Sequence, residues 1–373
     1  MKRKFMLISG VILLILLFLG LNNYNTVQND SINIGFIGAL TGPVAKYGSY
    51  EAVNLAVEEI NANGGINGKK INMIYEDGAC DPTKAAIAAN KLINADNVKI
   101  ILGGHCSSES LAIAPIIEEN KILMLASITT NPFLTDKGDY VFRTSPISTV
   151  QSKIVADYAY NELDLRNMAI IYEKTDYAGP IAERLKKEFS LNGGNIEVFE
   201  GFTKDNTDFS AILSKIKNAD SIFISVQSPD ASMIIVKQLK EMNLDLQIFG
   251  NAAAISSYNV NEMPNLYEGA ILAQPNYDES KENTKAFVQN YTKRYNVEVI
   301  PYGIWTAESY DAVYLIAEGI KQYGEDIEKL KEYLYSVKNY NGVSGSITID
   351  EFGDGVREFV LMEIKNGKQV PMN

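Results

Sequence analysis

The sequence predicts an α/β protein of two doubly wound lobes, each a parallel sheet covered by helices on both faces. Short apolar stretches alternate with segments of helical period along most of the chain, which is the order that βαβ units require. The alternation stops near Leu125 and restarts at Met168. A length of 373 residues suits two domains with sizeable cores. These three observations together predict two lobes of similar architecture.

The first set of elements extends from Ile32 to Leu125. Asn63-Gly64-Gly65 is a C-cap signal that ends one helix, and Asp81-Pro82 begins another with an N-cap and a proline at the first helical position. We expect strands Ile32–Gly38, Ile71–Tyr75, Lys99–Leu102 and Ile122–Leu125, separated by helices through Ala52 and Ile60, from Asp81 to Asn94, and at Ser108–Glu119.

The second set of elements begins at Met168. Here we expect strands Met168–Tyr172, Asn195–Phe199, Ser221–Val226, Gln247–Phe249 and Ala270–Ala273, with helices Gly179–Leu191, Phe209–Lys217 and Pro229–Met242. Further helices near Glu282–Tyr295, Ile304–Tyr323 and Ile327–Tyr335 precede two C-terminal strands, Ser346–Ile349 and Glu358–Ile364.

Composition excludes several classes of function. The chain has 34 basic and 46 acidic residues, a net charge of −12, and no basic patch, so it makes a poor nucleic-acid binder. One histidine and two cysteines cannot build a multi-histidine or four-cysteine metal site, and we expect neither a metal nor a cofactor. The run His105-Cys106-Ser107 contains nucleophile types, but adjacent residues rarely face one another and no second histidine offers a base. We therefore expect no enzymatic activity.

The N-terminus has the pattern of an export signal. Three cations follow Met1, and an apolar run extends from Phe5 to about Leu21. This run is near the lower length limit of a membrane span, so residues 1–24 are either a signal peptide or a retained anchor, with 25–31 as a tether. We therefore expect the protein in the periplasm or on the outer face of the cytoplasmic membrane. In that oxidising compartment, Cys80 and Cys106 favour a disulfide over two thiols.

Three loops that follow expected strands have the composition of a binding site for a small anion. They are Gly38–Pro43, Gly103–Ser108 and Ala126–Pro132, all small, rich in hydroxyls and poor in charge. Ligands bind beyond the carboxyl ends of parallel strands, where helix N-termini offer free N–H groups. Backbone amides and hydroxyls there suit a carboxylate, although capping and turn formation alone would favour the same residues.

Several segments resemble the branched-chain amino acid-binding proteins, which are solute receptors of ABC importers with the type I periplasmic binding fold. The resemblance covers about Ile32 to Glu363 and is closest in the N-terminal half. Its motifs are Gly38–Gly48, Glu58–Gly68, Asp77–Pro82, Cys106-Ser107-Ser108 and Asn131-Pro132.

The resemblance implies a monomer of two lobes joined by three hinge crossovers, near Ser145–Ser148, Ala273–Asn276 and Asp350–Asp354. The first lobe would comprise 32–146 plus 276–351, and the second 147–275 plus 352–373. It also implies hinge closure on a ligand, an ABC permease as partner, and a disulfide between Cys80 and Cys106.

The family's binding residues match particular positions of this sequence. By resemblance, Ser107 holds the ligand's carboxylate, Thr130 contributes its hydroxyl and amide, and the Ile128 carbonyl takes the ammonium. The expected ligand-binding set is Tyr47, His105, Ser107, Ile128, Thr129, Thr130, Tyr177, Gln227 and Asn251. If His105 lines the pocket, affinity should vary between about pH 5.5 and 7.5.

The ammonium half of the family's site is altered in this sequence. The loop Gly250–Ala254 lacks the family's acidic side chain, and Gln227 stands where the family has a tyrosine. A buried ammonium without a counter-charge is costly. Either Asp176, Asp230 or Glu308 substitutes, or the ligand is an amine-free carboxylate or an amide- or urea-type solute. A ligand sensor that acts on a separate signalling partner is a further alternative.

Overall fold

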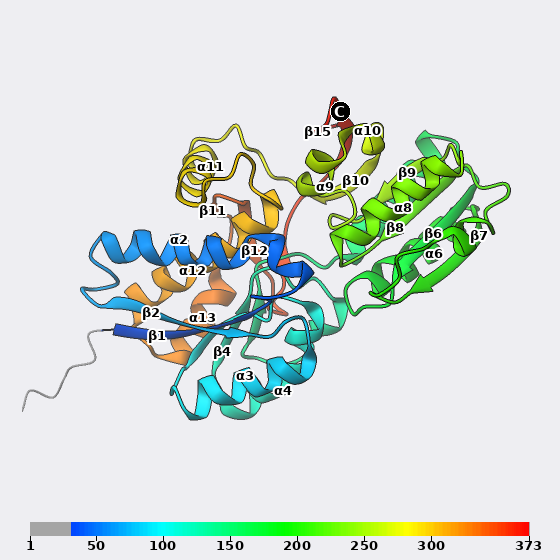
Figure 1. The fold of residues 1–373 in the computed structure, drawn as a ribbon. Helices are drawn as coiled ribbons and strands as arrows, with labels where there is room; N and C mark the ends of the chain where they lie inside the picture. Colours follow the sequence, from blue (N-terminus) through cyan, green and yellow to red (C-terminus); the bar gives the residue numbers. More distant parts are fainter. Residues whose placement is uncertain (1–30, 373) are drawn as a thin grey trace, which may run out of the picture.

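The structure, a computed structural model, describes residues 31–372. The expected signal peptide or anchor at 1–24 and most of the tether lie outside the described residues. Two α/β lobes, each built on its own sheet, lie side by side (Figure 1). Among the described residues, no helix is both long and apolar enough to cross a bilayer.

The first lobe contains a five-stranded, fully parallel sheet in the order β2-β1-β3-β4-β5. Its strands are β1 (Ser31–Gly38), β2 (Lys70–Asp77), β3 (Ile100–Leu102), β4 (Leu123–Ala126) and β5 (Val141–Arg143). Its helices are α2 (Ser49–Ala62), α3 (Pro82–Asn94), α4 (Ser107–Asn120), α11 (Glu282–Tyr295), α12 (Gly303–Tyr323) and α13 (Ile327–Ser336).

Alternation along β1 decides which helices cover which face of this sheet. Ile34 and Phe36 belong to one core with residues of α2 and α12, whereas Ile37 belongs to another with residues of α3 and α4. Successive side chains of a strand point to opposite faces, so both faces of the sheet are buried. Gly35 lets α3 approach closely, since a Cβ there would lie 2.8 Å from Leu92 Cδ1.

The second lobe contains a seven-stranded sheet in the order β15-β14-β10-β9-β8-β6-β7. Five strands are parallel: β6 (Asn167–Glu173), β7 (Asn195–Phe202), β8 (Ser221–Ser225), β9 (Gln247–Gly250) and β10 (Ile271–Pro275). Strands β14 (Phe359–Lys365) and β15 (Lys368–Pro371) add an antiparallel pair at one edge. Its helices are α5 (Thr149–Asp157), α6 (Ala178–Leu191), α7 (Ser210–Leu213), α8 (Pro229–Glu241), α9 (Ser257–Glu262) and α10 (Pro264–Tyr267). The predicted doubly wound α/β class is confirmed, with a partly antiparallel second sheet.

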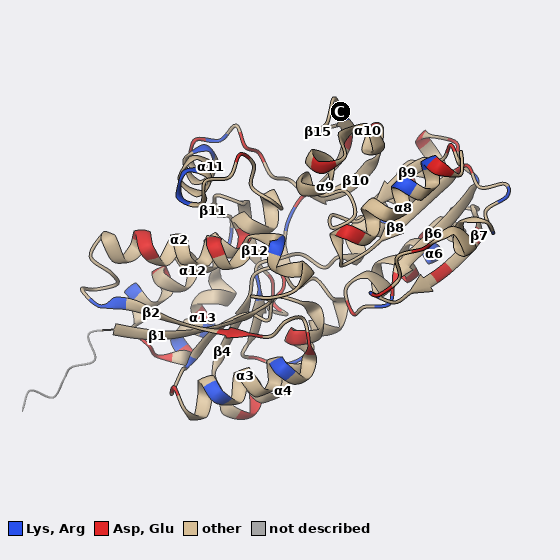
Figure 2. Ribbon diagram, in the orientation of Figure 1, with Lys and Arg blue, Asp and Glu red and all other residues tan. Residues whose placement is uncertain are grey.

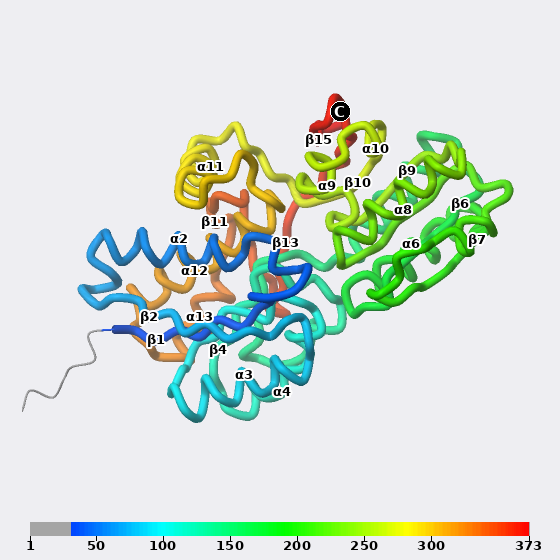
Figure 3. Tube along the Cα trace, in the orientation of Figure 1, coloured from blue at the N-terminus to red at the C-terminus, as the bar shows by residue number. Residues whose placement is uncertain are grey.

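The chain passes between the lobes three times, at 144–148, 276–281 and 357–358 (Figure 3). The third passage lies later than the expected Asp350–Asp354. Strands β11 (Tyr340–Gly342), β12 (Gly345–Ile349) and β13 (Gly355–Val356) form a small antiparallel sheet in that order. The Asp354 carboxylate also pairs with buried Arg143 at 2.7 Å. Residues 352–356 therefore remain with the first lobe.

Several elements of the second lobe differ from expectation, and α9, α10 and β15 were not expected at all. Helix α7 has four residues instead of Phe209–Lys217. After Leu213 the backbone N–H groups of Lys215 and Ile216 donate to carbonyls three residues back, at 3.1 Å each. The Glu197 carboxylate then accepts the N–H groups of Lys217 and Asn218 at 3.0 and 2.9 Å, so the helix does not continue. Helix α5 was not expected, because buried Gln151 and Ser152 interrupt its apolar pattern.

Charged residues are distributed over both lobes. Lys and Arg lie interspersed with Asp and Glu along the helices, without a continuous basic stripe on the drawn elements (Figure 2). Among residues 31–372, no cluster of three His, Cys, Asp or Glu side chains is placed to hold a metal ion.

Candidate ligand-binding site

A cavity of about 290 Å³ lies between the two lobes. Tyr47, His105, Cys106, Ser107, Ile128 and Trp305 line it from the first lobe, and Tyr177 and Gln227 from the second. Most of these residues follow the carboxyl ends of strands β1, β3, β4, β6 and β8, where parallel α/β folds bind ligands. Its lining of aromatic and aliphatic side chains with a few polar groups is typical of a small-molecule site.

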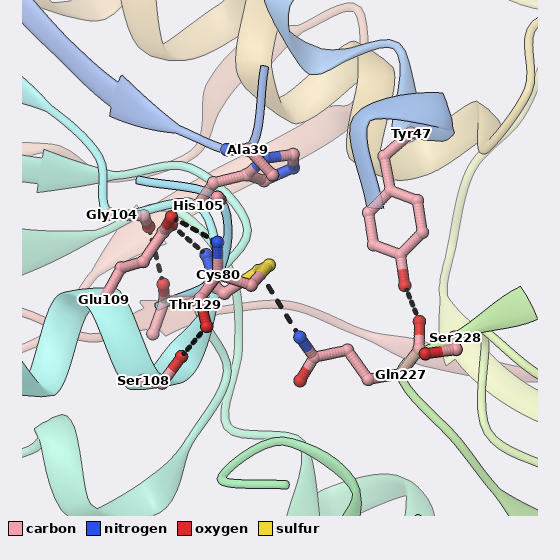
Figure 4. Close-up of a disulfide and its surroundings, with 12 residues drawn as sticks. Ala39, Tyr47, Cys80, Gly104, His105, Ser108, Glu109, Thr129, Gln227 and Ser228 are labelled. Atoms are coloured by element: carbon pink, nitrogen blue, oxygen red, sulfur yellow. Dashed lines mark hydrogen bonds between the residues drawn. A yellow bond between two sulfur atoms is a disulfide. The ribbon is translucent and has the colours of Figure 1, made fainter. Parts of the chain in front are cut away.

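A disulfide and a buried carboxylate hold the first-lobe loops of this cavity together. Cys80 and Cys106 form the predicted disulfide, with Cα atoms 5.3 Å apart. The Glu109 carboxylate accepts the backbone N–H groups of Cys80 and Cys106 at 2.9 and 2.8 Å. In Figure 4, Glu109 approaches the disulfide from one side and Gln227 from the other. Burial raises the pKa of Glu109 to about 7 in spite of these hydrogen bonds.

His105 presents a neutral donor to the cavity. Its Nδ1 accepts the Ala39 N–H at 3.3 Å, so the ring proton lies on Nε2. That Nε2 is buried and has no partner among the described residues. Burial lowers the pKa of His105 to about 3. The pH dependence expected between 5.5 and 7.5 therefore does not follow from this histidine, because it stays neutral over that range.

Ser107 is the first residue of α4 and is almost fully buried. Within the described residues its hydroxyl makes no hydrogen bond. The first turn of a helix also leaves backbone N–H groups without intrahelical partners, and these carry the positive end of the helix dipole. This corner of the cavity can accept a negatively charged oxygen.

The lobes already touch across the cavity. The Tyr47 hydroxyl donates to the Gln227 carbonyl, and Gln227 Nε2 lies 3.5 Å from Cys106 Sγ (Figure 4). Nearby, Lys46 pairs with Asp230 at 3.3 Å. The structure therefore shows the lobes in contact rather than splayed apart.

The second-lobe wall is positioned by a buried carboxylate that was not expected. Glu173, at the end of β6, is 1% exposed and accepts the backbone N–H groups of Gln227 and Ser228, both at 2.7 Å. The Ser228 hydroxyl donates to its other oxygen at 2.8 Å. Glu173 thus holds the loop that carries Gln227, and its sequence signal was an acidic residue at the end of an apolar strand.

Three of the expected residues do not line this cavity. Thr129 turns away and donates to the Gly104 carbonyl at 2.8 Å. Asn251 is fully buried and its amide donates to the Val226 carbonyl at 2.8 Å, which stabilises its own loop. Thr130 lines an adjoining cavity instead. The remaining six expected residues, Tyr47, His105, Ser107, Ile128, Tyr177 and Gln227, line the main cavity together.

The three acids considered as counter-charges differ in environment. Asp176 is exposed, and Asp230 is engaged by Lys46. Glu308 is 1% exposed and lines the adjoining cavity. Of the three, only Glu308 lies in the interior beside the binding region.

Trp305 was missed by the sequence analysis. It lies near the start of α12 and its ring packs between Tyr47 and Tyr177, with centroids 5.1 and 6.0 Å away. The available signal was that this is the only tryptophan of the chain, placed two residues after Pro301-Tyr302-Gly303.

Two α/β lobes, three connecting passages and a cavity between the lobes define a bilobal solute-binding protein. The chain belongs to the periplasmic binding protein family, whose family model matches residues 31–369. It is 32% identical over 330 residues to the leucine-, isoleucine-, valine-, threonine- and alanine-binding protein of Pseudomonas aeruginosa, a match that covers 87% of each chain.

Solved structures agree with this assignment. The fold is similar to that of a leucine-binding protein from Thermotoga maritima, with a TM-score of 0.82 and 28% identity over 92% of this chain and 98% of that one. It is equally similar to the branched-chain amino acid transporter substrate-binding protein of Streptococcus pneumoniae in complex with isoleucine. That match has a TM-score of 0.82 and 26% identity, and covers 92% of this chain and all of the other.

Proposed function

We propose that this protein binds a small amino acid of the branched-chain type between its lobes and delivers it to an ABC permease. The observation that carries the proposal is the convergence on one cavity of donors without partners: the Ser107 hydroxyl, the first turn of α4 and His105 Nε2. Such donors suit a carboxylate. The names of the curated relative and of the isoleucine complex support the ligand class.

The walls of the cavity suit an apolar side chain. Tyr47, Ile128, Tyr177 and Trp305 are each less than a tenth exposed and surround the space. Aromatic and aliphatic walls with a few polar groups are typical of small-molecule sites. A ligand that contacts both Ser107 and Gln227 bridges the lobes and favours their closed arrangement.

We expect the site to bind its ligand without catalysing a reaction. Cys106 is tied into the disulfide, so it provides no thiolate. His105 faces the cavity as a neutral donor, and its Nδ1 is occupied by Ala39. Because Nδ1 is occupied, His105 does not act as a general base for the Ser107 hydroxyl.

We place the protein outside the cytoplasm. It is either a free monomer after cleavage of a signal peptide or a monomer attached to the membrane by a retained N-terminal anchor. The cationic and apolar N-terminal pattern supports export, and a disulfide fits an oxidising compartment.

Isothermal titration calorimetry of the protein, unfolded and refolded to remove carried ligand, tests the proposal. The panel is leucine, isoleucine, valine, threonine and alanine, with isocaproate (leucine without its amino group) and isocaproamide (the amide of that acid). We expect one site with micromolar or tighter affinity for an amino acid. Ser107→Ala should weaken binding about 5- to 30-fold. Silence across the panel would refute the proposal.

Ser108→Ala is the matched control. Ser108 is the next residue of the same helix, but its hydroxyl donates to the Cys80 carbonyl at 3.0 Å and does not line the cavity. We expect this variant to lower thermal stability slightly and to leave affinity unchanged.

The alternative ligand class is an amine-free carboxylate or an amide. The observation that favours it is the loop Gly250–Ala254, where no carboxylate occurs and the Asn251 amide is committed to the backbone. Isocaproate or isocaproamide, neither of which has an amino group, binding at least as tightly as leucine would select this alternative.

A further inference from the structure

A thin partition separates the main cavity from an open groove beside the disulfide. Residues of both lobes line the groove, among them Cys80, Ser108 and Asp176. Within residues 31–372, Gln227 alone lines both the cavity and the groove. Cys106 lines the cavity, whereas its disulfide partner Cys80 lines the groove. The partition therefore consists of the disulfide from the first lobe and Gln227 from the second.

The contact that closes this partition is weak. Gln227 Nε2 lies 3.5 Å from Cys106 Sγ, and its side chain extends from the second lobe to the disulfide (Figure 4). Sulfur is a poor hydrogen-bond acceptor. The described part of the chain offers the Gln227 carboxamide no other hydrogen bond. The carboxamide thus fills the space between cavity and groove without an essential bond to the fold.

The main chain of Gln227 is fixed on both sides. Its N–H donates to the buried Glu173 carboxylate at 2.7 Å, and its carbonyl accepts the Tyr47 hydroxyl. The side chain therefore starts from a set position, and its length decides where the cavity ends. Glutamine reaches the Cys106 sulfur, whereas a side chain that stopped at Cβ would leave the cavity open to the groove.

The ligand nitrogen is the part of the ligand that meets this partition. In the proposed function the carboxylate lies at Ser107, the residue after Cys106, and the nitrogen is on the carbon next to that carboxylate. Gln227 supplies the one carboxamide of the cavity lining, whereas Tyr177 and Trp305 offer apolar rings. A polar nitrogen is better placed against the carboxamide than against the rings. A group attached to that nitrogen needs the space that the Gln227 side chain fills.

We propose that Gln227 is a specificity-determining residue, which restricts the site to free amino acids and excludes N-acylated amino acids and peptides. This inference rests on the proposed function. An acetyl group on the ligand nitrogen has nearly the size of the carboxamide end of glutamine. Both groups cannot occupy the space beside the Cys106 sulfur, because protein interiors are close-packed. The groove beyond is open and lined by Ser108, Lys174 and Asp176, so a peptide chain that passed the partition would stay hydrated.

Calorimetry with leucine and N-acetylleucine tests the partition. The wild type should bind N-acetylleucine at least about tenfold more weakly than leucine, since extra atoms in a packed site are costly. Gln227→Ala should shift this preference at least about tenfold towards N-acetylleucine. Its Tm should change little, because the hydrogen bond that is lost is a weak one to sulfur. If another amino acid of the panel binds best, that amino acid and its N-acetyl derivative replace the pair.

Gln227→Met is the matched control, because methionine has nearly the length and volume of glutamine but no carboxamide. This variant should keep the partition closed and retain the wild-type preference for leucine. A shift as large as that of Gln227→Ala would mean that the amide chemistry of Gln227, and not its length, sets the preference. That result would overturn the inference.

Glycylglycylleucine tests whether the cavity and the groove become one space. Its chain is too long for the space that Gln227→Ala vacates, so it binds only if it can continue into the groove. We expect Gln227→Ala to bind this peptide and the wild type not to bind it. A variant that admits N-acetylleucine but not glycylglycylleucine would show that no partition to the groove was removed.

Three further results would overturn the role of Gln227. Gln227→Ala could keep the wild-type preference, it could lose both probes with an unchanged Tm, or the wild type could bind N-acetylleucine as tightly as leucine. The proposed function would stand in each case in which the wild type binds leucine. A wild type that binds no amino acid of the panel would instead overturn the proposed function and this inference together.

Discussion

The carboxylate of Glu109, which ties together the two half-cystine loops, gives the protein a distinct dependence of stability on pH. Burial raises its pKa from 4.5 to about 7. Between these values the folded protein retains a proton that the unfolded chain has released, so the free energy of unfolding falls as pH rises through this window. For this shift, the loss between about pH 5 and pH 8 is roughly 2–3 kcal/mol.

Glu109→Gln removes this dependence, because glutamine has the shape and charge of the protonated acid. We expect the variant to gain roughly 2–3 kcal/mol relative to the wild type between about pH 5 and pH 8, measured by urea unfolding at both values. Shifts of other groups are common to both proteins and cancel in the comparison.

The control is Glu119→Gln, an exposed position on the same helix. Its difference from the wild type should be the same at both pH values. If Glu109→Gln behaves like this control, burial does not dominate the ionisation of Glu109, and the account of the loop fails.

Three further predictions concern the same cavity. Burial lowers the pKa of His105 to about 3, so the wild type should lose stability as pH falls from about 6.5 towards 3. Urea unfolding of His105→Asn should not show this loss. A variant with the same pH profile as the wild type would contradict the prediction. Tyr47→Phe removes the hydrogen bond to the Gln227 carbonyl. It should weaken leucine binding about 2- to 10-fold and reduce compaction in X-ray scattering, whereas unchanged values for both would place the hydroxyl outside the closure. Replacing Cys80 and Cys106 by alanine should lower the free energy of unfolding by about 3–4 kcal/mol, and urea midpoints equal to the wild type would disprove this.

The apolar pattern and the cap signals were sufficient to predict most elements of the fold. Helix α11 has the predicted bounds, and Asp81 caps α3 by accepting N–H groups of Thr83 and Lys84. Helix α5 was not predicted because polar Gln151 and Ser152 occupy buried positions beside Val155 and Ala156, and Gln151 lines the adjoining cavity. A pattern based on apolar spacing is weakest where polar side chains are buried for a purpose.

The binding site was predictable only as far as residues follow the family's motifs. Thr129 and Thr130 are adjacent and both were expected, but neighbouring residues of an extended segment point to opposite sides, and only Thr130 reaches a cavity. Ser148 and Gln151 come from the start of α5, whereas Glu308 comes from α12, more than 150 residues later. Their meeting depends on how the three passages pack, which no local pattern describes.

The position of the single tryptophan provides the protein with a built-in optical reporter. Trp305 is 6% exposed and separates the two cavities, and no other indole in the 373 residues contributes to its emission. Entry of a guest molecule on either side of this ring changes the polarity and the quenching groups around it. A fluorescence titration of the unlabelled protein should therefore follow ligand occupancy directly. The shift of its emission spectrum should distinguish a ligand that occupies only the main cavity from one that reaches the adjoining cavity.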